Sequence, residues 1–172
     1  FVAPQQNMVY ADVDGNVGFI APAPVPVRKP ENALRGLAPA PGWDARYDWD
    51  GFIPYEQLPR TWRPAGGSVV TANQNILEPG YPHFITAEWT LPYRHDRIVA
   101  LLAAKQRHEP ASFETIQADV LSQPMLELLP ILRQARPTSP AGRAALERVA
   151  QWDARMVADA PEPLIATAWV DR

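Results

Sequence analysis

Residues 66–75 read Gly-Gly-Ser-Val-Val-Thr-Ala-Asn-Gln-Asn and join an apolar run to a cluster of side-chain amides. The small and β-branched residues 68–72 favour a half-buried β-strand, and the two glycines let the chain enter it in almost any conformation. Asn73, Gln74 and Asn75 follow at once, where their amides can donate hydrogen bonds toward a neighbouring cleft. Because asparagine is also a common turn residue, the spacing by itself favours a structural turn over a functional amide.

A β-hairpin is predicted further upstream, with strands at residues 7–11 and 17–21. Residues 12–16 between them read Asp-Val-Asp-Gly-Asn. Asp-Gly supplies the positive backbone angles that a tight hairpin turn demands. A calcium-binding loop has a similar sequence pattern, but here the glycine comes too early and no glutamate follows at the required distance.

The region 22–64 is rich in proline and aromatic residues. Prolines at 22, 24 and 26 favour an extended, polyproline-like course and argue against a central strand. The many aromatic rings are typical of an ordered segment that crosses the surface and packs on a core, with some rings free to line a pocket. A free-standing, non-catalytic binding module that uses residues 22–64 to hold a partner is the alternative. The rings belong to Trp43, Tyr47, Trp49, Phe52, Tyr55 and Trp62.

Helical periodicity predicts that residues 96–172 form a helical segment. It follows a first part, residues 1–95, that is predicted to contain the strands and the proline- and aromatic-rich crossing segment. The first helix is expected to end near 105–108 and the next to begin at Ser112 and stop before Pro124. A further helix at 126–135 is expected to kink at Pro130, and Ser139-Pro140 is typical of a helix start. Residues 163–170 favour a last helix.

Composition excludes several function classes. The net charge of −3 comes without a basic stripe, which argues against nucleic acid, and the longest apolar run is the seven residues 98–104, which argues against a membrane span. With no cysteine, thiol catalysis and disulfides are excluded. The histidines at 83, 95 and 108 are isolated, and no serine has a nucleophile-elbow pattern. The acidic cluster at 44, 48 and 50 favours capping and turns over a cation site, so metal ligands stay unknown.

Five motifs, in this order along the chain, resemble the penicillin amidase family of N-terminal-nucleophile hydrolases, which includes penicillin and acyl-homoserine-lactone acylases. The similarity is good over about residues 6–100 and weaker in the helical part. The motifs are Tyr-Ala-Asp-Val-Asp-Gly-Asn-Val-Gly at 10–18, Trp-Asp at 43–44, Asp-Trp-Asp-Gly-Phe-Ile-Pro at 48–54, Pro-Ala-Gly-Gly at 64–67 and Ala-Asn-Gln-Asn at 72–75.

This resemblance implies an α+β fold: part of an αββα sandwich, built from the hairpin and one further strand, followed by a helical segment. The chain would be an interior fragment of the β chain, partnered by the α chain and the rest of the β chain. The parent enzyme would cleave linear, acylated amides through an acyl-enzyme on an N-terminal serine outside these residues, so the fragment alone would be inactive. It would lie in the periplasm, use no catalytic cofactor and, in some relatives, carry a structural calcium.

The resemblance also implies two site residues. Aligning residues 72–75 with the family's Ala-Asn-x-Asn places Asn75 as the side-chain donor to the oxyanion, beside a backbone amide. Gln74 replaces a residue that is often aromatic in the family, which leaves the shape of the neighbouring pocket open. Asp96-Arg97 resembles a family pair at a helix start, so Arg97 would orient the serine or Asn75. An ordinary surface salt bridge is the other interpretation of Arg97.

Overall fold

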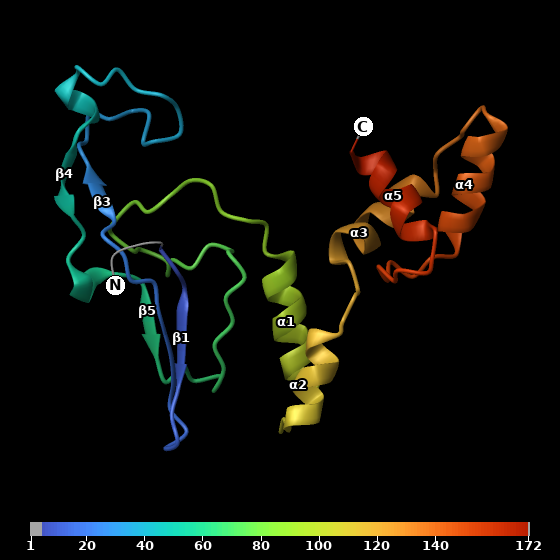
Figure 1. Cartoon of the computed structure of the whole chain (residues 1–172), viewed down its shortest axis with the longest axis horizontal. Coiled ribbons are helices and arrows are strands. Elements are labelled where there is room, and N and C mark those ends of the chain that lie inside the picture. Colours follow the sequence, from blue (N-terminus) through green and yellow to red (C-terminus); the bar gives the residue numbers. More distant parts are fainter. Residues whose placement is uncertain (1–4, 172) are drawn as a thin grey trace. The chain divides into compact units, whose positions relative to one another are not determined.

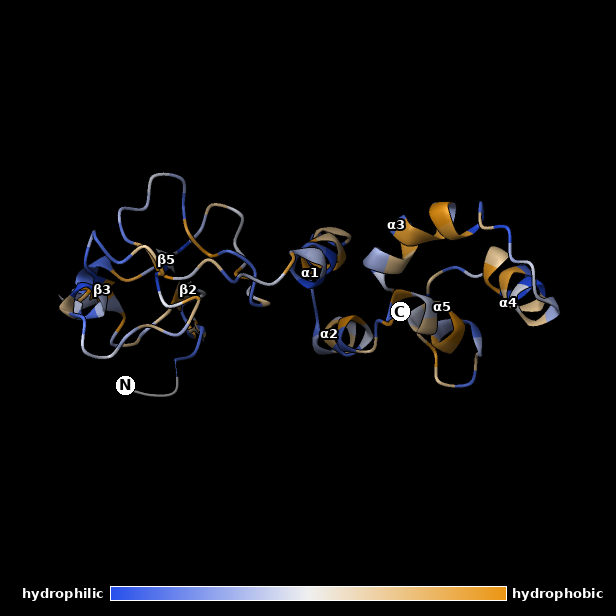
Figure 2. Cartoon of the chain, turned by 90° about the horizontal axis from the view of Figure 1, so that it is seen from above, coloured by the Kyte–Doolittle hydropathy of each residue, from blue (hydrophilic) through white to orange (hydrophobic). Residues whose placement is uncertain are grey.

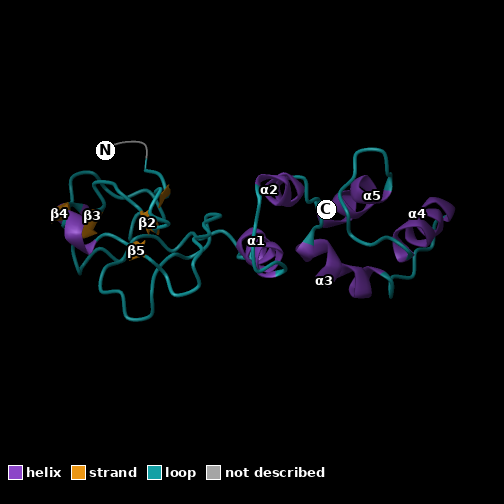
Figure 3. Cartoon of the chain, turned by 90° about the horizontal axis from the view of Figure 1, so that it is seen from below, coloured by secondary structure: helices purple, strands orange, loops and turns teal. Residues whose placement is uncertain are grey.

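The computed structural model describes residues 5–171. The chain divides into two compact units, Phe1–His95 and Asp96–Arg172. Among the described residues, all the strands lie in the first unit, where long loops connect them. The α-helices lie in the second unit, apart from the first turn of α1 (Figure 3). The mixed α+β class predicted from the sequence is therefore confirmed.

The predicted hairpin forms one sheet with a third, distant strand. Strands β1 (Met8–Ala11) and β2 (Val17–Ile20) pair antiparallel, and β5 (Arg60–Trp62) pairs with β2, which gives the order β1-β2-β5 (Figure 1). The Asp12 carboxylate accepts hydrogen bonds from the backbone N–H groups of Asp14 and Asn16, at 3.0 and 2.9 Å. Gly15 takes the positive φ of 81° that the turn requires. The hairpin prediction is confirmed.

A second, two-stranded sheet contains β3 (Pro26–Arg28) and β4 (Trp49–Phe52), paired antiparallel with an irregular register. The sequence predicted an extended course here that is no central strand, and residues 26–28 are extended but also pair with β4 on one side, which was not predicted. Proline is tolerated here because it is the first residue of a strand that has only one neighbour. Short 3₁₀ helices at Ala45–Tyr47 and Tyr55–Gln57 flank β4. The buried core of this region consists of Val25, Ile53 and Leu58.

Residues 68–72, predicted as the further strand of the sandwich, belong to no strand; β5 is the third strand instead. A strand is defined by backbone pairing with a neighbour. The backbone of Ala72 instead bonds side chains: its N–H donates to Gln74 Oε1 at 2.8 Å and its C=O accepts from Arg94 at 2.7 Å. Local side-chain bonds thus replace a ladder in this segment.

The second unit is made of α1 (Tyr93–Ala103, whose first residues belong to the first unit), α2 (Pro110–Gln117), α3 (Gln123–Leu132), α4 (Pro140–Ala150) and α5 (Glu162–Val170). Its core gathers apolar side chains of α3, α4 and α5, which show as orange stretches in Figure 2. The fully buried members are Leu129, Val149, Ala154 and Ala166, and Trp152 is nearly so.

Helix starts follow the predicted chemistry with one shift. Ser139 caps α4, because its hydroxyl accepts from the Gly142 N–H at 3.1 Å, as predicted. Ser112, predicted as the cap of α2, lies inside the first turn instead, where its hydroxyl accepts from the Glu109 N–H at 3.0 Å. Proline at the first helical position explains the shift, since it moves the helix start to residue 110. None of the helices within residues 5–171 combines the length and the apolar character that a membrane crossing needs.

Candidate active site

The polar turn at residues 73–75 is held by both its backbone and its side chains. Asn73 has a left-handed backbone, with φ at 65°, a conformation that asparagine tolerates better than most residues. Its Oδ1 accepts from Arg94 Nη2 at 2.8 Å, and its C=O accepts from the Thr90 N–H at 3.0 Å. Arg94 therefore bridges Asn73 and the Ala72 carbonyl with one nitrogen. The side chain of Asn73 is occupied in holding the turn.

Asn75 uses only half of its amide in local structure. Its Oδ1 accepts from the Leu77 N–H at 3.0 Å, which closes an Asx turn. This bond fixes the orientation of the amide plane and leaves its NH₂ group without a hydrogen-bond partner among residues 5–171. An NH₂ group with a fixed direction and no internal partner is the kind of donor that can stabilise a developing negative charge.

Asn75 lines a cavity of about 260 Å³ beside the β1-β2-β5 sheet. Phe19 of β2 and Thr61 of β5 contribute the wall on the sheet side, and residues 68–71 contribute another wall. Gln74 also lines the cavity and is fixed by its bond from the Ala72 N–H. The residue that replaces the family's frequent aromatic side chain thus puts an amide, not a ring, at this wall.

Arg97, the second predicted site residue, belongs to the second unit. Its guanidinium makes two hydrogen bonds to the Asp119 carboxylate, at 2.8 and 2.7 Å, and the two side chains are 26% and 12% exposed. The hydrogen bonds from Arg97 lower the pKa of Asp119, and the carboxylate in turn raises the pKa of Arg97. Arg97 and Asn75 are thus placed in different units, and Arg94 is the arginine that binds the polar turn.

Sequence reasoning did not single out Arg94. It lies one helical turn before Arg97, and the spacing alone does not tell which arginine reaches back to the turn at 73–75. The strongest signal was its position near a helix start, which both arginines share.

Two of the histidines, His83 and His108, and Asp44 of the acidic cluster have structural partners. His108 contacts the Ser112 hydroxyl at 3.1 Å and the Leu102 carbonyl at 2.8 Å, and Ser112 is 6% exposed and bonded to the Glu109 backbone, so this pair joins α1 to α2. His83 bonds Gln57. Asp44 is paired with Arg46 and caps a 3₁₀ helix. Residues 5–171 contain no group of three or more acidic or histidine side chains placed to hold a metal ion.

A sequence profile described as penicillin amidase matches residues 1–172. The chain belongs to the penicillin amidase family. It is 36% identical over 153 residues to penicillin acylase 2 proenzyme of Pseudomonas sp. (strain SE83), a match over 87% of this chain and 19% of the relative. It is 32% identical over 179 residues to acyl-homoserine lactone acylase QuiP of Pseudomonas aeruginosa, over 95% of this chain and 20% of that relative.

A solved structure of a penicillin acylase has the same fold as this chain. The thermostable penicillin G acylase from Alcaligenes faecalis superimposes with a TM-score of 0.62 and 26% identity, over 87% of this chain and 27% of that one. The chain spans about a fifth of the length of the curated relatives named above. The prediction that it has an N-terminal-nucleophile hydrolase fold is confirmed.

Proposed function

We propose that this chain supplies the side-chain oxyanion donor, Asn75, to an acylase that hydrolyses linear, acylated amides. The relatives are named as acylases and are about five times longer than the matched region, so the proposed enzyme includes further protein beyond these residues. In this proposal the α chain and the rest of the β chain are the partners of residues 1–172. A periplasmic location is part of the same proposal and rests on the family resemblance.

The observation that carries this proposal is the half-used amide of Asn75. Its Oδ1 accepts from the Leu77 N–H, no hydrogen bond of its NH₂ group joins it to residues 5–171, and Asn75 lines the cavity beside the sheet. When a nucleophile attacks an amide carbonyl, the oxygen becomes an anion, and a prepositioned N–H donor stabilises that anion more than it stabilises the substrate.

The nucleophile in this proposal is the N-terminal serine of the β chain, with its own α-amino group as the base. The serine oxygen adds to the carbonyl carbon, and collapse of the oxyanion expels the amine and leaves an acyl ester on the serine. Water then cleaves the ester and releases the acid. Asn75 donates to the oxyanion in both steps. Because the serine lies in other segments, we propose that residues 1–172 alone have no amidase activity.

Arg97 and Arg94 have separate roles in this proposal. Arg94 positions the turn through the Ala72 carbonyl and Asn73. Arg97 is a positioning residue for the serine or Asn75, and Asp119 holds its guanidinium in place. We propose no metal ligands, because Asp44 of the acidic cluster is engaged by Arg46, and calcium in the whole enzyme remains a prediction from the family.

The alternative, a non-catalytic binding module, has one observation in its favour. Several aromatic rings of residues 22–64 are exposed, among them Trp43 at 90%. Aromatic side chains are favoured at protein interfaces, so such a strip suits a partner as well as the rest of an enzyme.

Turnover by the full-length acylase tests the proposal. We expect it to release the chromophore from a phenylacetyl or fatty-acyl anilide with a rapid first burst, and to show the mass of an acyl adduct on the N-terminal serine. Residues 1–172 purified alone should release none. Turnover by residues 1–172 alone, with contaminants excluded, would contradict the proposal. So would a full-length protein that hydrolyses neither the phenylacetyl nor the fatty-acyl anilide.

A further inference from the structure

We propose that Arg28 and Arg35 form a binding site for a carboxylate group on a short apolar stem. The site is a cavity of about 250 Å³ in the first unit, separate from the Asn75 cavity, between the end of β3, the loop that follows it and residues 82–84. We call it the Arg28 site. Its existence does not depend on the proposed acylase activity.

Arg28, a half-buried residue, brings one buried and unpaired guanidinium nitrogen to this site. Its Nη1 is buried from solvent and has no hydrogen-bond partner among the described residues. Its guanidinium lies 5.6 Å from the centre of the Phe84 ring. A buried donor on a charged group is costly when unpaired, and a ring face compensates only part of that cost. The Arg28 side chain is therefore built to receive an anion.

The loop at 32–36 is shaped around the Arg28 guanidinium. Gly36 approaches the mobile end of this side chain, since a Cβ there would lie 2.8 Å from Arg28 Nη2, and its φ of 80° is a conformation that favours glycine. Asn32, which is 6% exposed, accepts from the Arg35 N–H through Oδ1 at 2.9 Å. Arg35 takes a φ of 51°, which is uncommon for arginine, and its guanidinium lies 5.1 Å from the same Phe84 ring. Two guanidinium groups thus share one ring.

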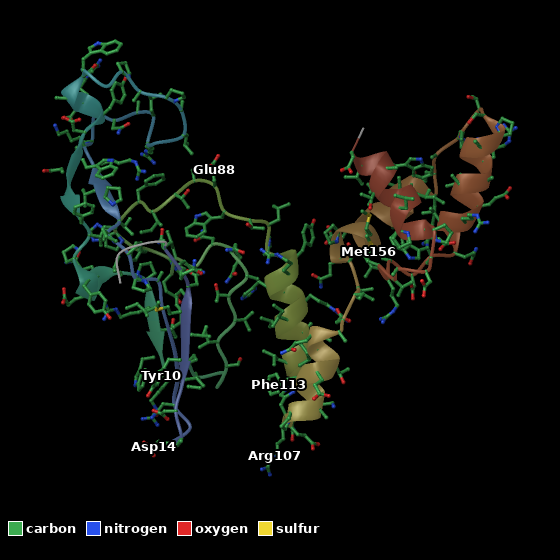
Figure 4. The ribbon with its side chains drawn as sticks, viewed as in Figure 1. Tyr10, Asp14, Glu88, Arg107, Phe113 and Met156 are labelled. Carbon is green, nitrogen blue, oxygen red and sulfur yellow. The ribbon has the colours of Figure 1, made fainter. Side chains whose placement is uncertain are left out.

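The lining of the cavity contains no acid to neutralise these charges. Its charged residues are Arg28, Lys29 and Arg35, and Lys29 is engaged by the Ala45 carbonyl at 2.7 Å. Arg28 also borders a larger cavity that includes Glu88. Glu88 is exposed and projects outward from its loop (Figure 4), and Arg28 Nη1 has no partner among the described residues.

The chemistry of the lining fits a carboxylate on an apolar stem. The planar guanidinium fork matches the two oxygens of a carboxylate, and Val27, Ile53 and Phe84 offer apolar surface to the stem that carries it. Two sources supply this group: an Asp or Glu side chain from another segment of the full-length protein, or a free small-molecule acid. Both make the same bonds to Arg28.

Titration of residues 1–172 with sodium benzoate tests the site directly, at a protein concentration at which analytical ultracentrifugation shows a monomer. The arginine side-chain N–H signals are followed by NMR, with sodium chloride at equal ionic strength as the reference. We expect saturable shifts of the Arg28 and Arg35 signals with benzoate and none with chloride. Arg28→Gln should weaken benzoate binding about tenfold or more, as expected for a charge-assisted bond, and Arg35→Gln by a smaller factor. Arg46→Gln, outside the cavity, is the matched control and should leave binding unchanged.

Three outcomes overturn the proposal. The first is that benzoate shifts the arginine signals no more than chloride does. The second is that Arg28→Gln binds benzoate with the same affinity as the wild type. If Arg28→Gln does not fold, the third is that Arg35→Gln binds benzoate with the wild-type affinity. The same titration of the full-length protein identifies the source of the carboxylate. Retained binding assigns a free acid. If the full-length protein does not bind benzoate and its Tm falls in Arg28→Gln but not in Arg46→Gln, an internal Asp or Glu occupies the site. If it does not bind benzoate and the Tm of Arg28→Gln is unchanged, the proposal is wrong. None of these readouts uses acylase activity, so the site and the proposed function can fail independently.

Discussion

Asn73 and Asn75 carry the same amide two residues apart, but their backbones give them different tasks. Asn73, at a φ of 65°, turns its Oδ1 to Arg94, whereas the Oδ1 of Asn75 accepts from the Leu77 N–H and Asn75 lines the cavity. A stability role and a catalytic role are therefore expected to separate cleanly between them.

Replacing Asn73 tests the stability role. Asn73→Ala removes the acceptor for Arg94 and puts alanine in a left-handed backbone, so we expect the free energy of unfolding to fall by about 1–2 kcal/mol. Asn73→Gly, which adopts that backbone without strain, should lose less. Urea unfolding of both variants gives the comparison. Equal losses in the two variants would show that the conformation of residue 73 does not matter.

At this scale the sequence predicted the amide cluster but not its partner. The run of Asn73, Gln74 and Asn75 can be read directly from the sequence. Which arginine reaches the turn depends on how the segment between residues 75 and 93 folds back, and no local pattern records that. The Arg28 site was invisible for the same reason, because residues 28, 35 and 84 meet only in the folded unit.

Helix caps offer a test at the scale of elements. Ser139 accepts from the Gly142 N–H at the start of α4, whereas Ser122, at the same position before α3, makes no such side-chain bond. We expect Ser139→Ala to lower the free energy of unfolding by about 1 kcal/mol and Ser122→Ala to change it much less. Thermal and urea unfolding measure both. A larger effect at Ser122 would contradict the assignment of the caps.

The Arg97–Asp119 pair joins α1 to the residues after α2 and makes stability depend on pH. Bonding to Arg97 lowers the folded-state pKa of Asp119 below its ordinary value of 3.8. The stability it contributes is therefore complete above the ordinary pKa and is lost as the pH falls through the lower, folded-state value. Asp119→Asn should be less stable at pH 7, by about 1–3 kcal/mol, and should show a weaker loss in acid.

Urea unfolding between pH 7 and pH 2.5 measures this dependence. Asp44→Asn is the control, because Asp44 pairs with Arg46 only two residues away on an exposed surface, and its effect should be smaller. An identical pH profile in wild type and Asp119→Asn would show that this ion pair contributes nothing.

Helices were easier to predict than strands because their signals are local. The Ser139-Pro140 start and the prolines that end or enter helices lie within a few residues of the boundaries they set. Residues 68–72 have strand composition, yet a strand also needs a partner, and Ala72 bonds the side chains of Gln74 and Arg94 instead. β5 contains the strand-favouring residues Thr61 and Trp62 but is only three residues long, so its pairing with β2 could not be read from the sequence.

At the scale of the whole molecule, the first unit exposes surface that suits burial. Every residue of β1, at the edge of its sheet, is exposed, as are Trp43, Trp49 and Trp62. We expect residues 1–172 alone to bind a hydrophobic dye and to associate as concentration rises. Analytical ultracentrifugation measures the association. A cooperative monomer without dye binding would instead favour the binding-module alternative.

The most direct test of the central claim is kcat of the full-length acylase with Asn75→Ala, beside Asn73→Ala as the matched amide. We expect Asn75→Ala to fold, to mature normally and to lose about a hundredfold or more in kcat, because the donor acts mainly in the transition state. Asn73→Ala should keep most of kcat and lose stability. If Asn75→Ala keeps its kcat while a folded, matured Asn73→Ala loses it, the assignment of Asn75 as the oxyanion donor is wrong.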